Sequence, residues 1–389
     1  MTRPYKLMLI CGEPSGDMLG AQLMAALKEL TGGSIAITGV GGEAMKAEGL
    51  QPLFGLEATS VTGLLEVVSH IPEILRRVRR AADYAVATKP DAVVVIDSPD
   101  FTHRIAKRIK RLAPDLRTIN YVAPQVWAAR AYRARHMARY FDLVLALLPF
   151  EPPFFASYGL KAVFVGHPAL ERGKQMVGGD AFRARHNIPA AAPLLAVLPG
   201  SRGNEVKFLL PVFAETVKLL AARIPGLHTV IPAVPHVAAR IREGVAGWPA
   251  PLTLIEGEAE KFAAFDAADA ALAASGTVTT ELALSKTPMV VSYKVSALTA
   301  ALYRPLVRVK FYTLVNLILD RLAVPELMQE EAQPELLANA VYPLLTDPTA
   351  AAAQVADLDE ALVRMGQGAE NPSRRAAQAI LDFLAEKTS

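Results

Sequence analysis

Acidic side chains follow two strongly apolar runs in the first half of the chain. Asp97 comes directly after Val-Val-Val-Ile at residues 93–96, and Glu13 follows the apolar run 7–11 and one glycine. Parallel α/β sheets bind ligands at the carboxyl ends of their strands, so both carboxylates can belong to a site. Desolvation there would raise the pKa of Asp97 and favour a general base. The alternative, which the spacing does not separate, is that Asp97 or Ser98 caps the next helix.

The residues that follow Glu13 predict its backbone conformation and the capping of the next helix. Pro14 favours an extended backbone at Glu13, which lets its carboxylate project from the loop. Ser15 and Asp17 are candidates to cap the helix that begins here. The capping interpretation is stronger for these two residues than for Glu13.

A cation stands at a similar loop in the second half of the chain. Arg202 follows the apolar run 194–198 and the loop Pro-Gly-Ser, and Glu205 comes three residues later. A guanidinium group binds phosphate oxygens in pairs, and the start of the next helix adds a favourable dipole. Glu205 can orient Arg202 or complete a capping arrangement that begins at Ser201.

A second loop of small residues follows in the same half. Ser275, Gly276 and Thr277 come after the apolar run 270–274, and Glu281 lies one turn into the next helical pattern. Small residues let the backbone approach a phosphate or a ribose closely, and a carboxylate such as Glu281 can bond both ribose hydroxyls. Together the loops at Arg202 and Ser275 favour a sugar-nucleotide site.

Strand-like runs alternate with helical patterns along the chain, which is typical of parallel sheets with helical crossovers. The two glycine loops at Gly12 and Gly200 lie 188 residues apart, and 389 residues exceed one ordinary core. We therefore predict an α/β protein with two Rossmann-like domains that face one cleft, over residues 1–170 and 194–345, with a linker over 171–193 and C-terminal helices over 346–389. Strands are predicted at 6–11, 35–38, 92–96, 117–122, 143–147, 162–165, 194–198, 228–231, 252–255, 270–274 and 289–293.

Composition excludes several classes of protein. Hydrophobic residues make up 52% and charged residues 20%, which is a globular balance. The single cysteine, Cys11, excludes an internal disulfide and a cysteine-based zinc site, and we expect it to be buried. The glycine spacing fits neither a Walker loop nor a dinucleotide fingerprint. With no signal-peptide pattern and no run of ~18 uncharged apolar residues, we expect a cytosolic protein whose membrane contact is peripheral.

Positive charge gathers in the first half of the chain. From His70 to Tyr140 there are 15 lysines and arginines against 6 acidic residues. Such a surface attracts phosphates, although any one cluster can equally be a solvated helix face. An apolar helical stripe precedes it and predicts either a helix packed on the sheet or an interfacial membrane helix. The stripe comprises Leu64, Leu65, Val67, Val68, Ile71, Ile74 and Leu75.

The ordered motifs of the chain resemble the lipid-A-disaccharide synthase family. The resemblance runs from Leu7 to about Glu330 with the family's spacing. The matching segments are 12–17 (GEPSGD), 60–67 (SVTGLLEV), 96–101 (IDSPDF), 121–130 (YVAPQVWAAR), 148–151 (LPFE), 166–168 (GHP), 198–202 (LPGSR) with Glu205, 275–277 (SGT) with Glu281, and 324–327 (VPEL) with Gln329.

This resemblance implies a fold and a reaction. The fold is the two-domain B-type glycosyltransferase fold. The reaction is inverting, metal-independent and without a cofactor: 2,3-diacylglucosamine passes from UDP-2,3-diacylglucosamine to the 6-hydroxyl of 2,3-diacylglucosamine 1-phosphate, and the β-1,6 disaccharide and UDP are released. The family further implies peripheral association with the cytoplasmic face of the inner membrane, and C-terminal helices that cross back to the first domain or swap within a homodimer.

The resemblance also assigns roles to residues of this chain. Asp97 matches the essential aspartate that activates the acceptor, Arg202 the essential arginine at the diphosphate, and Glu13 a further catalytic position. The nucleotide side is expected to comprise Arg202, Glu205, Ser275, Gly276, Thr277, Glu281 and Asn316. The acceptor side is expected to include Ser15, Gly16, Asp100, Gln125 and Trp127, and the stripe from Leu64 to Leu75 is expected to contact the membrane.

Two departures and two alternatives accompany these expectations. Pro14 stands where alanine is common, and the loop after Asn316 lacks the usual glycine. Another B-type UDP-sugar transferase or an epimerase would share the second-half site but has no need of the apolar stripe. A binding protein that uses the basic half is the non-enzymatic alternative; its nucleic-acid form is disfavoured by the 7% aromatic content without aromatic–basic interleaving.

Overall fold

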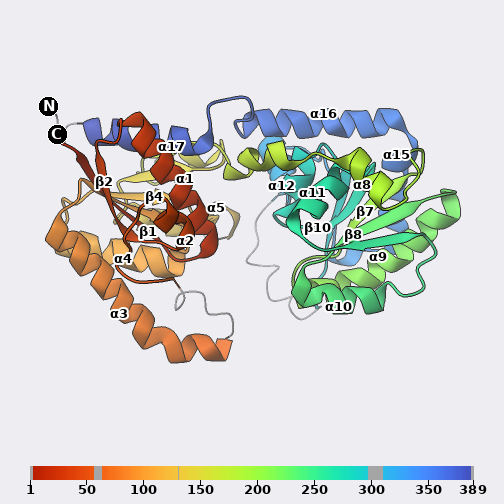
Figure 1. Ribbon diagram of the computed structural model, residues 1–389, viewed down its shortest axis with the longest axis horizontal. Coiled ribbons are helices and arrows are strands. Elements are labelled where there is room, and N and C mark those ends of the chain that lie inside the picture. Colours follow the sequence, from red (N-terminus) through yellow and green to blue (C-terminus); the bar gives the residue numbers. More distant parts are fainter. Residues whose placement is uncertain (1–2, 57–63, 130, 297–309, 387–389) are drawn as a thin grey trace. The chain divides into compact units, whose positions relative to one another are not determined.

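Two six-stranded parallel sheets organise the chain (Figure 1). The computed structural model describes residues 3–56, 64–129, 131–296 and 310–386, without the side chains of residues 64–71 and 129. The chain forms two units: unit 1 contains Met1–Pro168 and Gly368–Ser389, and unit 2 contains Ala169–Gln367. The expected α/β architecture of two Rossmann-like folds is confirmed.

Unit 1 has the strand order β2-β1-β3-β4-β5-β6. Its central strand β3 is apolar throughout because both faces are covered: Val94 and Ile96 point to one cluster, and Val93 and Val95 to the other. The strands are β1 (Tyr5–Cys11), β2 (Ile35–Val40), β3 (Ala92–Ile96), β4 (Thr118–Tyr121), β5 (Leu143–Ala146) and β6 (Ala162–Phe164), all at predicted positions.

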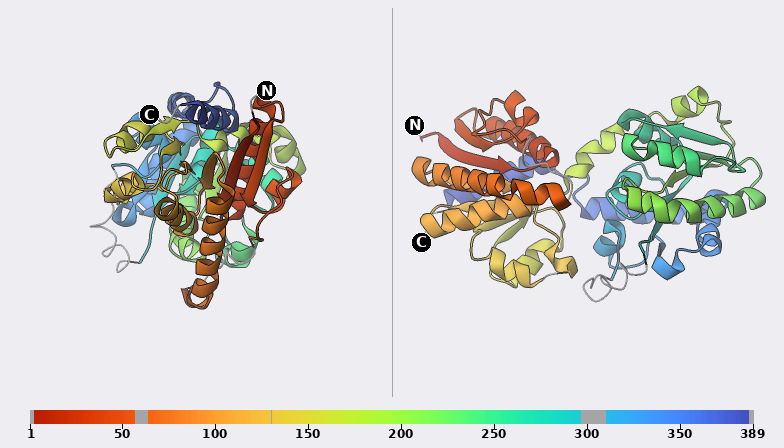
Figure 2. Two further views of the ribbon diagram at one scale, coloured as in Figure 1. Left: turned by 90° about the vertical axis from the view of Figure 1, so that its left-hand side faces the viewer. Right: turned by 90° about the horizontal axis from the view of Figure 1, so that it is seen from below.

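Helices cover both faces of the unit 1 sheet. Helices α1 (Pro14–Leu30) and α17 (Pro372–Ala385) pack together on one face (Figure 1). On the other face α3 (Leu64–Thr88) and α4 (Pro99–Leu112) lie side by side (Figure 2). Shorter helices complete the unit, namely α2 (Glu43–Ala47), α5 (Val126–Ala129), α6 (Tyr132–Met137) and α7 (Glu151–Ala156).

Unit 2 has the strand order β12-β11-β10-β7-β8-β9. The five predicted strands are present as β7 (Leu194–Leu198), β8 (His228–Pro232), β9 (Leu252–Ile255), β10 (Ala270–Ala274) and β11 (Met289–Tyr293). Strand β12 (Glu326–Met328) was not predicted, because three residues at a sheet edge carry no periodic pattern.

Helices α9 (Gly203–Arg223), α10 (Pro235–Gly244) and α15 (Pro334–Thr346) cover one face of the unit 2 sheet. The described part of unit 2 also contains α11 (Glu258–Ala267), α12 (Val278–Leu284), α14 (Leu314–Leu319) and α16 (Pro348–Arg364), with the short η2 (Gln329–Glu331). The segment expected to be a linker holds η1 (Pro168–Gln175) and α8 (Gly179–Arg185), and α8 packs on α11 within unit 2.

The apolar stripe expected at the membrane lies on α3. Leu64, Leu65, Val67, Val68 and Ile71 belong to its helical backbone, but their side chains lie outside the described part of the structure. Ile74 packs partly against the core, whereas Leu75 is 37% exposed. Within the described residues, no helix combines the length and apolarity needed to span a bilayer.

The expectation that Asp17 caps its own helix is wrong. Asp17 is buried, and its carboxylate accepts backbone N–H bonds from Gly42 (2.6 Å), Ala44 (2.9 Å) and Met45 (3.1 Å), so it caps α2 instead. A Cβ on Gly42 would lie 2.7 Å from Asp17 Oδ2, so a side chain there would displace the carboxylate. The predicted cap at Ser15 is absent as well, because the cap residue of α1 is Glu13 and makes no side-chain cap bond.

We predict that Asp17→Ala lowers the free energy of unfolding of unit 1 by about 3 kcal/mol, since it leaves three N–H groups without their charged acceptor. Thermal unfolding followed by calorimetry measures the loss. Asp115→Ala, at an exposed loop position, is the matched control. Equal melting temperatures for the two variants would contradict the role of Asp17.

Candidate active site

A pocket of about 310 Å³ opens at the carboxyl ends of the strands of unit 2. Three strand-to-helix turns form it: one after β7, one after β8 and one after β10. Six of the seven residues predicted on the nucleotide side line this pocket together: Arg202, Glu205, Ser275, Gly276, Thr277 and Glu281. The sequence therefore predicted which loops of unit 2 come together.

Arg202 is the cap residue immediately before α9 and is held by Glu205. Its side chain is 80% exposed, and its Nη1 donates to Glu205 Oε1 at 2.8 Å. The other oxygen of the buried Glu205 carboxylate accepts from the backbone N–H groups of Ser201 (3.0 Å) and Arg202 (3.2 Å). Glu205 thus orients the guanidinium and caps the helix, so both predicted roles coexist. These two N–H groups are occupied, and the exposed guanidinium remains a donor at this turn.

Gly200 allows this arrangement. Its φ is +113°, and a Cβ there would lie 2.5 Å from the Cβ of Glu205. A side chain would therefore both strain the backbone and displace the carboxylate.

Glu281 lies at the inner wall of the pocket as a buried carboxylate. Lys261 Nζ lies 2.9 Å and 3.1 Å from its two oxygens, and Arg172 Nη1 lies 3.3 Å from one of them. Sequence reasoning missed Lys261 and Arg172, because both are distant in the chain and neither belongs to a motif. The two cations and their hydrogen bonds offset the cost of burying the carboxylate.

The loop after β10 presents open backbone to the pocket. A Cβ built on Gly276 would meet nothing within 4 Å. The Gly276 carbonyl accepts from Thr279 Oγ1 at 2.8 Å, which fixes the first turn of α12. A ligand can therefore approach this loop as closely as the sequence predicted.

The structure does not support direct ligand contact by Asn316. This side chain is fully buried in α14. Its Nδ2 donates to Val324 O (2.7 Å) and Glu326 Oε1 (2.8 Å), and its Oδ1 accepts from the N–H groups of Ala323 and Val324 (2.8 Å each). All four hydrogen-bonding positions are filled. Asn316 instead holds the segment that leads into β12.

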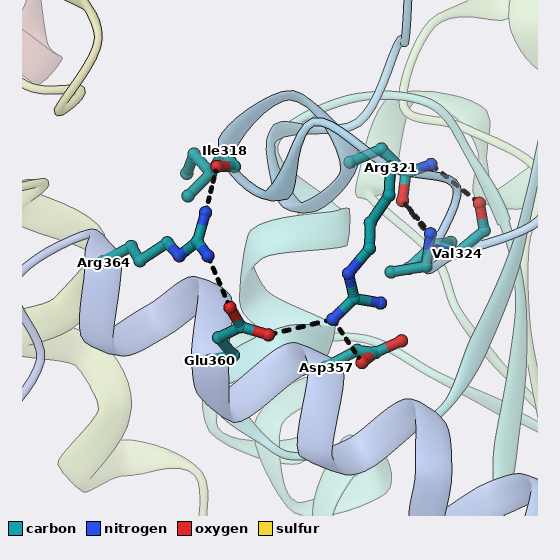
Figure 3. Close-up of polar contacts among 8 residues, drawn as sticks. Ile318, Arg321, Val324, Asp357, Glu360 and Arg364 are labelled. Atoms are coloured by element: carbon teal, nitrogen blue, oxygen red, sulfur yellow. Dashed lines mark hydrogen bonds and ion pairs between the residues drawn. The ribbon is translucent and has the colours of Figure 1, made fainter.

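The divergent loop after Asn316 is anchored to α16 (Figure 3). Asp320 takes the left-handed conformation, φ 51°, that a glycine would adopt at this helix end. Arg321 donates to Asp357 (2.7 Å) and Glu360 (2.9 Å), and Arg364 joins Glu360 (2.6 Å) to the carbonyl end of α14. The missing glycine is thereby compensated locally.

In unit 1 three of the predicted acceptor-side residues, Ser15, Gly16 and Asp100, lie around the turn after β3. Asp97 and Ser98 both take left-handed backbone conformations, with φ of 53° and 46°. Neither side chain caps α4, so the capping alternative for Asp97 does not hold. The Ser15 hydroxyl makes a long hydrogen bond, 3.4 Å, to Asp97 Oδ2. Thr102 Oγ1 donates to the carbonyls of Asp97 (2.6 Å) and Ser98 (3.0 Å) and secures the turn.

Two glycines bring the start of α1 against this turn. A Cβ on Gly16 would lie 3.2 Å from the Ile96 carbonyl, and one on Gly12 would lie 2.8 Å from the Cβ of Ser98. The exposed Glu13 has the extended backbone that Pro14 predicts, with φ −142° and ψ 160°. Glu13 and Asp97 therefore belong to turns in direct contact.

The remaining acceptor-side residues differ in exposure and in hydrogen bonding. Asp100 and Gln125 are exposed. The Trp127 indole donates to Glu151 Oε1 at 3.2 Å, and Glu151 Oε2 accepts from the N–H groups of Leu147 and Leu148 at 3.0 Å. Burial raises the pKa of Glu151 above its ordinary value, although these hydrogen bonds act to lower it. Trp127 is thus tied to a buried carboxylate whose role the sequence did not reveal.

Solved structures share this fold at low identity. UDP-GlcNAc 2-epimerase from Neisseria meningitidis, solved bound to UDP-GlcNAc, aligns with a TM-score of 0.61 and 14% identity over 98% of this chain and 100% of that one. A glycosyltransferase from Rickettsia africae aligns with a TM-score of 0.62 and 11% identity over the full length of both chains. These similarities establish the two-domain fold of B-type glycosyltransferases and sugar-nucleotide epimerases.

Sequence relatives are much closer. Lipid-A-disaccharide synthase of Rhodospirillum centenum is 46% identical over 99% of this chain and 96% of its own length. Its counterpart in Paramagnetospirillum magneticum is 47% identical over 97% of both. The family model for lipid-A-disaccharide synthetase matches residues 7–381. Because these matches span nearly all of the sequence, the chain belongs to the lipid-A-disaccharide synthetase family.

Proposed function

We propose that the chain transfers 2,3-diacylglucosamine from UDP to the 6-hydroxyl of 2,3-diacylglucosamine 1-phosphate, with inversion at the anomeric carbon. The observation that carries this proposal is the exposed Arg202 guanidinium, which a buried carboxylate holds at the mouth of the unit 2 pocket. Membership of the family supports the reaction class, and the epimerase solved with UDP-GlcNAc shows that a related fold accepts such a nucleotide.

Unit 2 is proposed to bind the nucleotide. Arg202 uses only Nη1 for Glu205, so the rest of its guanidinium fork can meet the diphosphate. Glu281, at the inner wall, would accept hydrogen bonds from the ribose hydroxyls, and the open backbone of the loop at Gly276 would pass beside the sugar or phosphate. Asn316 would support the site indirectly by holding the segment before β12.

Unit 1 is proposed to bind and activate the acceptor. Asp97 would accept the proton of the 6-hydroxyl as its oxygen bonds to the anomeric carbon and the bond from that carbon to UDP breaks. The electron pair then passes to the diphosphate, where Arg202 meets the growing charge. Glu13 and Ser15, beside Asp97, would orient the acceptor sugar.

Helix α3 is proposed to contact the cytoplasmic face of a membrane. The acylated substrates reside in a bilayer, so the enzyme must reach its surface. Leu75 is exposed on this helix, and Arg79 and Arg80 are exposed one turn later, where they can meet lipid phosphates. The proposed membrane contact of α3 thus combines an apolar side chain with positive charge.

We predict that the purified protein releases UDP from UDP-2,3-diacylglucosamine only when the acylated acceptor is present, and not from UDP-N-acetylglucosamine alone.

Asp97→Asn should lower kcat by about 10³-fold, the scale of general-base catalysis, with UDP affinity unchanged. A coupled assay for UDP and calorimetric titration of UDP measure the two effects.

Asp115→Asn, at an exposed loop of unit 1, should retain full activity. Wild-type protein that is inactive on the acylated pair refutes the proposed reaction. An Asp97→Asn protein that loses its circular-dichroism spectrum refutes only the catalytic role of Asp97, because the loss would then be structural.

We predict that Arg202→Ala lowers kcat/KM by about 10²–10³-fold, the scale of losing one donor to a developing oxyanion, with most of the effect on kcat. Steady-state kinetics with the donor varied separates the two parameters. Arg242→Ala removes a 64% exposed arginine of α10 outside the pocket and should be neutral. Equal kinetics for the two variants would exclude Arg202 from the reaction.

We predict that a triple variant with Leu65, Val68 and Leu75 replaced by serine remains folded but no longer sediments with anionic vesicles. The reason is that each leucine or valine contributes about 1.5–3 kcal/mol when it is buried in the membrane. The matched control replaces three exposed apolar residues of unit 2, namely Leu322, Leu336 and Val363, by serine. If both triple variants sediment like the wild type, α3 is not the membrane contact.

A further inference from the structure

A second pocket, of about 490 Å³, lies within unit 1 and adjoins the Asp97 turn. Its walls come from α4, from α6 and from the loop after β4. Pro99 and Asp100, two and three residues after Asp97, line its near end. None of the residues with a predicted role in unit 1 lies on the far side of this pocket.

The pocket is strongly cationic, and its charges are not neutralised by the protein. Arg104 and Lys107 project from α4 and Arg133 from α6, against the single carboxylate of Asp100. Among the described residues, no carboxylate forms an ion pair with any of these three cations. Arg104 Nε donates to the Asp100 carbonyl at 2.8 Å, and Lys107 Nζ lies 4.9 Å from the Tyr140 ring centroid.

Two other basic residues of α4, outside this pocket, are paired, whereas the exposed Arg111 forms no ion pair among the described residues. Arg108 binds Asp83 at 2.8 Å, and Lys110 binds Asp142 at 2.8 Å. Exposed cations that line one concavity without acidic partners attract an anion to it. The pocket thus has the charge of a phosphate site.

A buried histidine forms part of the pocket wall. His103 is 8% exposed, and its Nδ1 lies 3.2 Å from the Tyr140 hydroxyl. Burial, aided by the charges of Lys107 and Arg133, lowers the pKa of His103 to about 3, so the ring is neutral at physiological pH. If the hydroxyl donates to Nδ1, Nε2 carries the proton, and Nε2 has no partner among the described residues. A buried donor without a partner is a second sign of a missing ligand or water.

We propose that this pocket binds a phosphomonoester and that its occupant is the 1-phosphate of the acceptor. This inference rests on the proposed function. With the acceptor 6-hydroxyl at Asp97, the anomeric phosphate lies across one pyranose ring, and the pocket begins two residues after Asp97. Arg104, Lys107 and Arg133 meet the phosphate oxygens, and the pocket thereby selects the phosphorylated acceptor.

The kinetic test uses a pocket variant and a variant of equal charge. Lys107→Gln with Arg133→Gln removes two cations from the pocket. Arg111→Gln with Arg135→Gln removes two exposed cations of α4 and α6 that do not line the pocket. Assays run in nonionic detergent micelles without phospholipid, so that the only lipid phosphate is that of the acceptor.

We expect the pocket variant to raise the acceptor KM at least tenfold and the control to change it less than twofold. With an acceptor that lacks the 1-phosphate, wild type and pocket variant should have the same KM. Equal increases in the two variants would overturn the proposal, since they indicate a general surface potential. A wild-type KM that is indifferent to the phosphate would overturn it too.

A binding measurement separates this proposal from the proposed function. Glucosamine 1-phosphate is titrated calorimetrically into each protein, and we expect at least tenfold weaker binding by the pocket variant only. If wild type does not bind it, the subsite is refuted even where transfer is observed. If wild type binds it but does not transfer, the proposed reaction fails and the phosphate site stands.

A lipid headgroup is the competing source of the phosphate. Sedimentation with phosphatidylglycerol vesicles, in the absence of acceptor, should give the same bound fraction for the pocket variant and the charge-matched control. A pocket variant that alone loses vesicle binding, with an unchanged acceptor KM, would assign the pocket to a headgroup and overturn the acceptor assignment.

Discussion

A buried carboxylate that accepts backbone N–H groups is the interaction on which the candidate site depends. Burying such a charge is costly unless hydrogen bonds replace its water. Glu205, Asp17 and Glu151 each meet this condition by accepting two or three backbone N–H bonds near the end of a strand or the start of a helix. Because the three carboxylates are buried, they anchor the turns that they close to the core of their unit. The loops of the site are therefore rigid at their bases.

Glu205 shows how this constraint serves chemistry. One oxygen satisfies the orphan N–H groups at the start of α9, and the other holds the guanidinium of Arg202. The arginine is fixed at its inner side while remaining 80% exposed at the pocket. Such preorganisation matters because a donor that must reorient during the reaction stabilises less of the developing charge. A shorter side chain at this position could not reach both groups.

The sequence predicted structural features that depend on neighbouring residues and missed contacts between residues that are distant in the chain. Continuous apolar runs identified the long strands because strands covered on both faces need no polar positions. Asp17 was assigned to its own helix because capping rules are local, whereas its partners lie 25 to 28 residues away. Lys261 of α11 reaches Glu281 of α12 only through the packing of α11 against β7 and β8, which no spacing encodes. The buried position of Asn316 likewise required the fold of the loop after it.

The two units hold their key residues by different means. In unit 2 the turn at Arg202 is unstrained, because its left-handed position is occupied by Gly200. In unit 1 three residues with side chains take positive φ at the ends of β3 and β4: Asp97, Ser98 and Val122, with 66° at the β-branched Val122. Such positions cost about 1–3 kcal/mol each and persist only where packing enforces them. The hydrogen bonds of Thr102 and the close approach of Gly12 provide that enforcement. The turn at the end of β3 therefore fixes the direction of the Asp97 carboxylate at a cost in backbone strain.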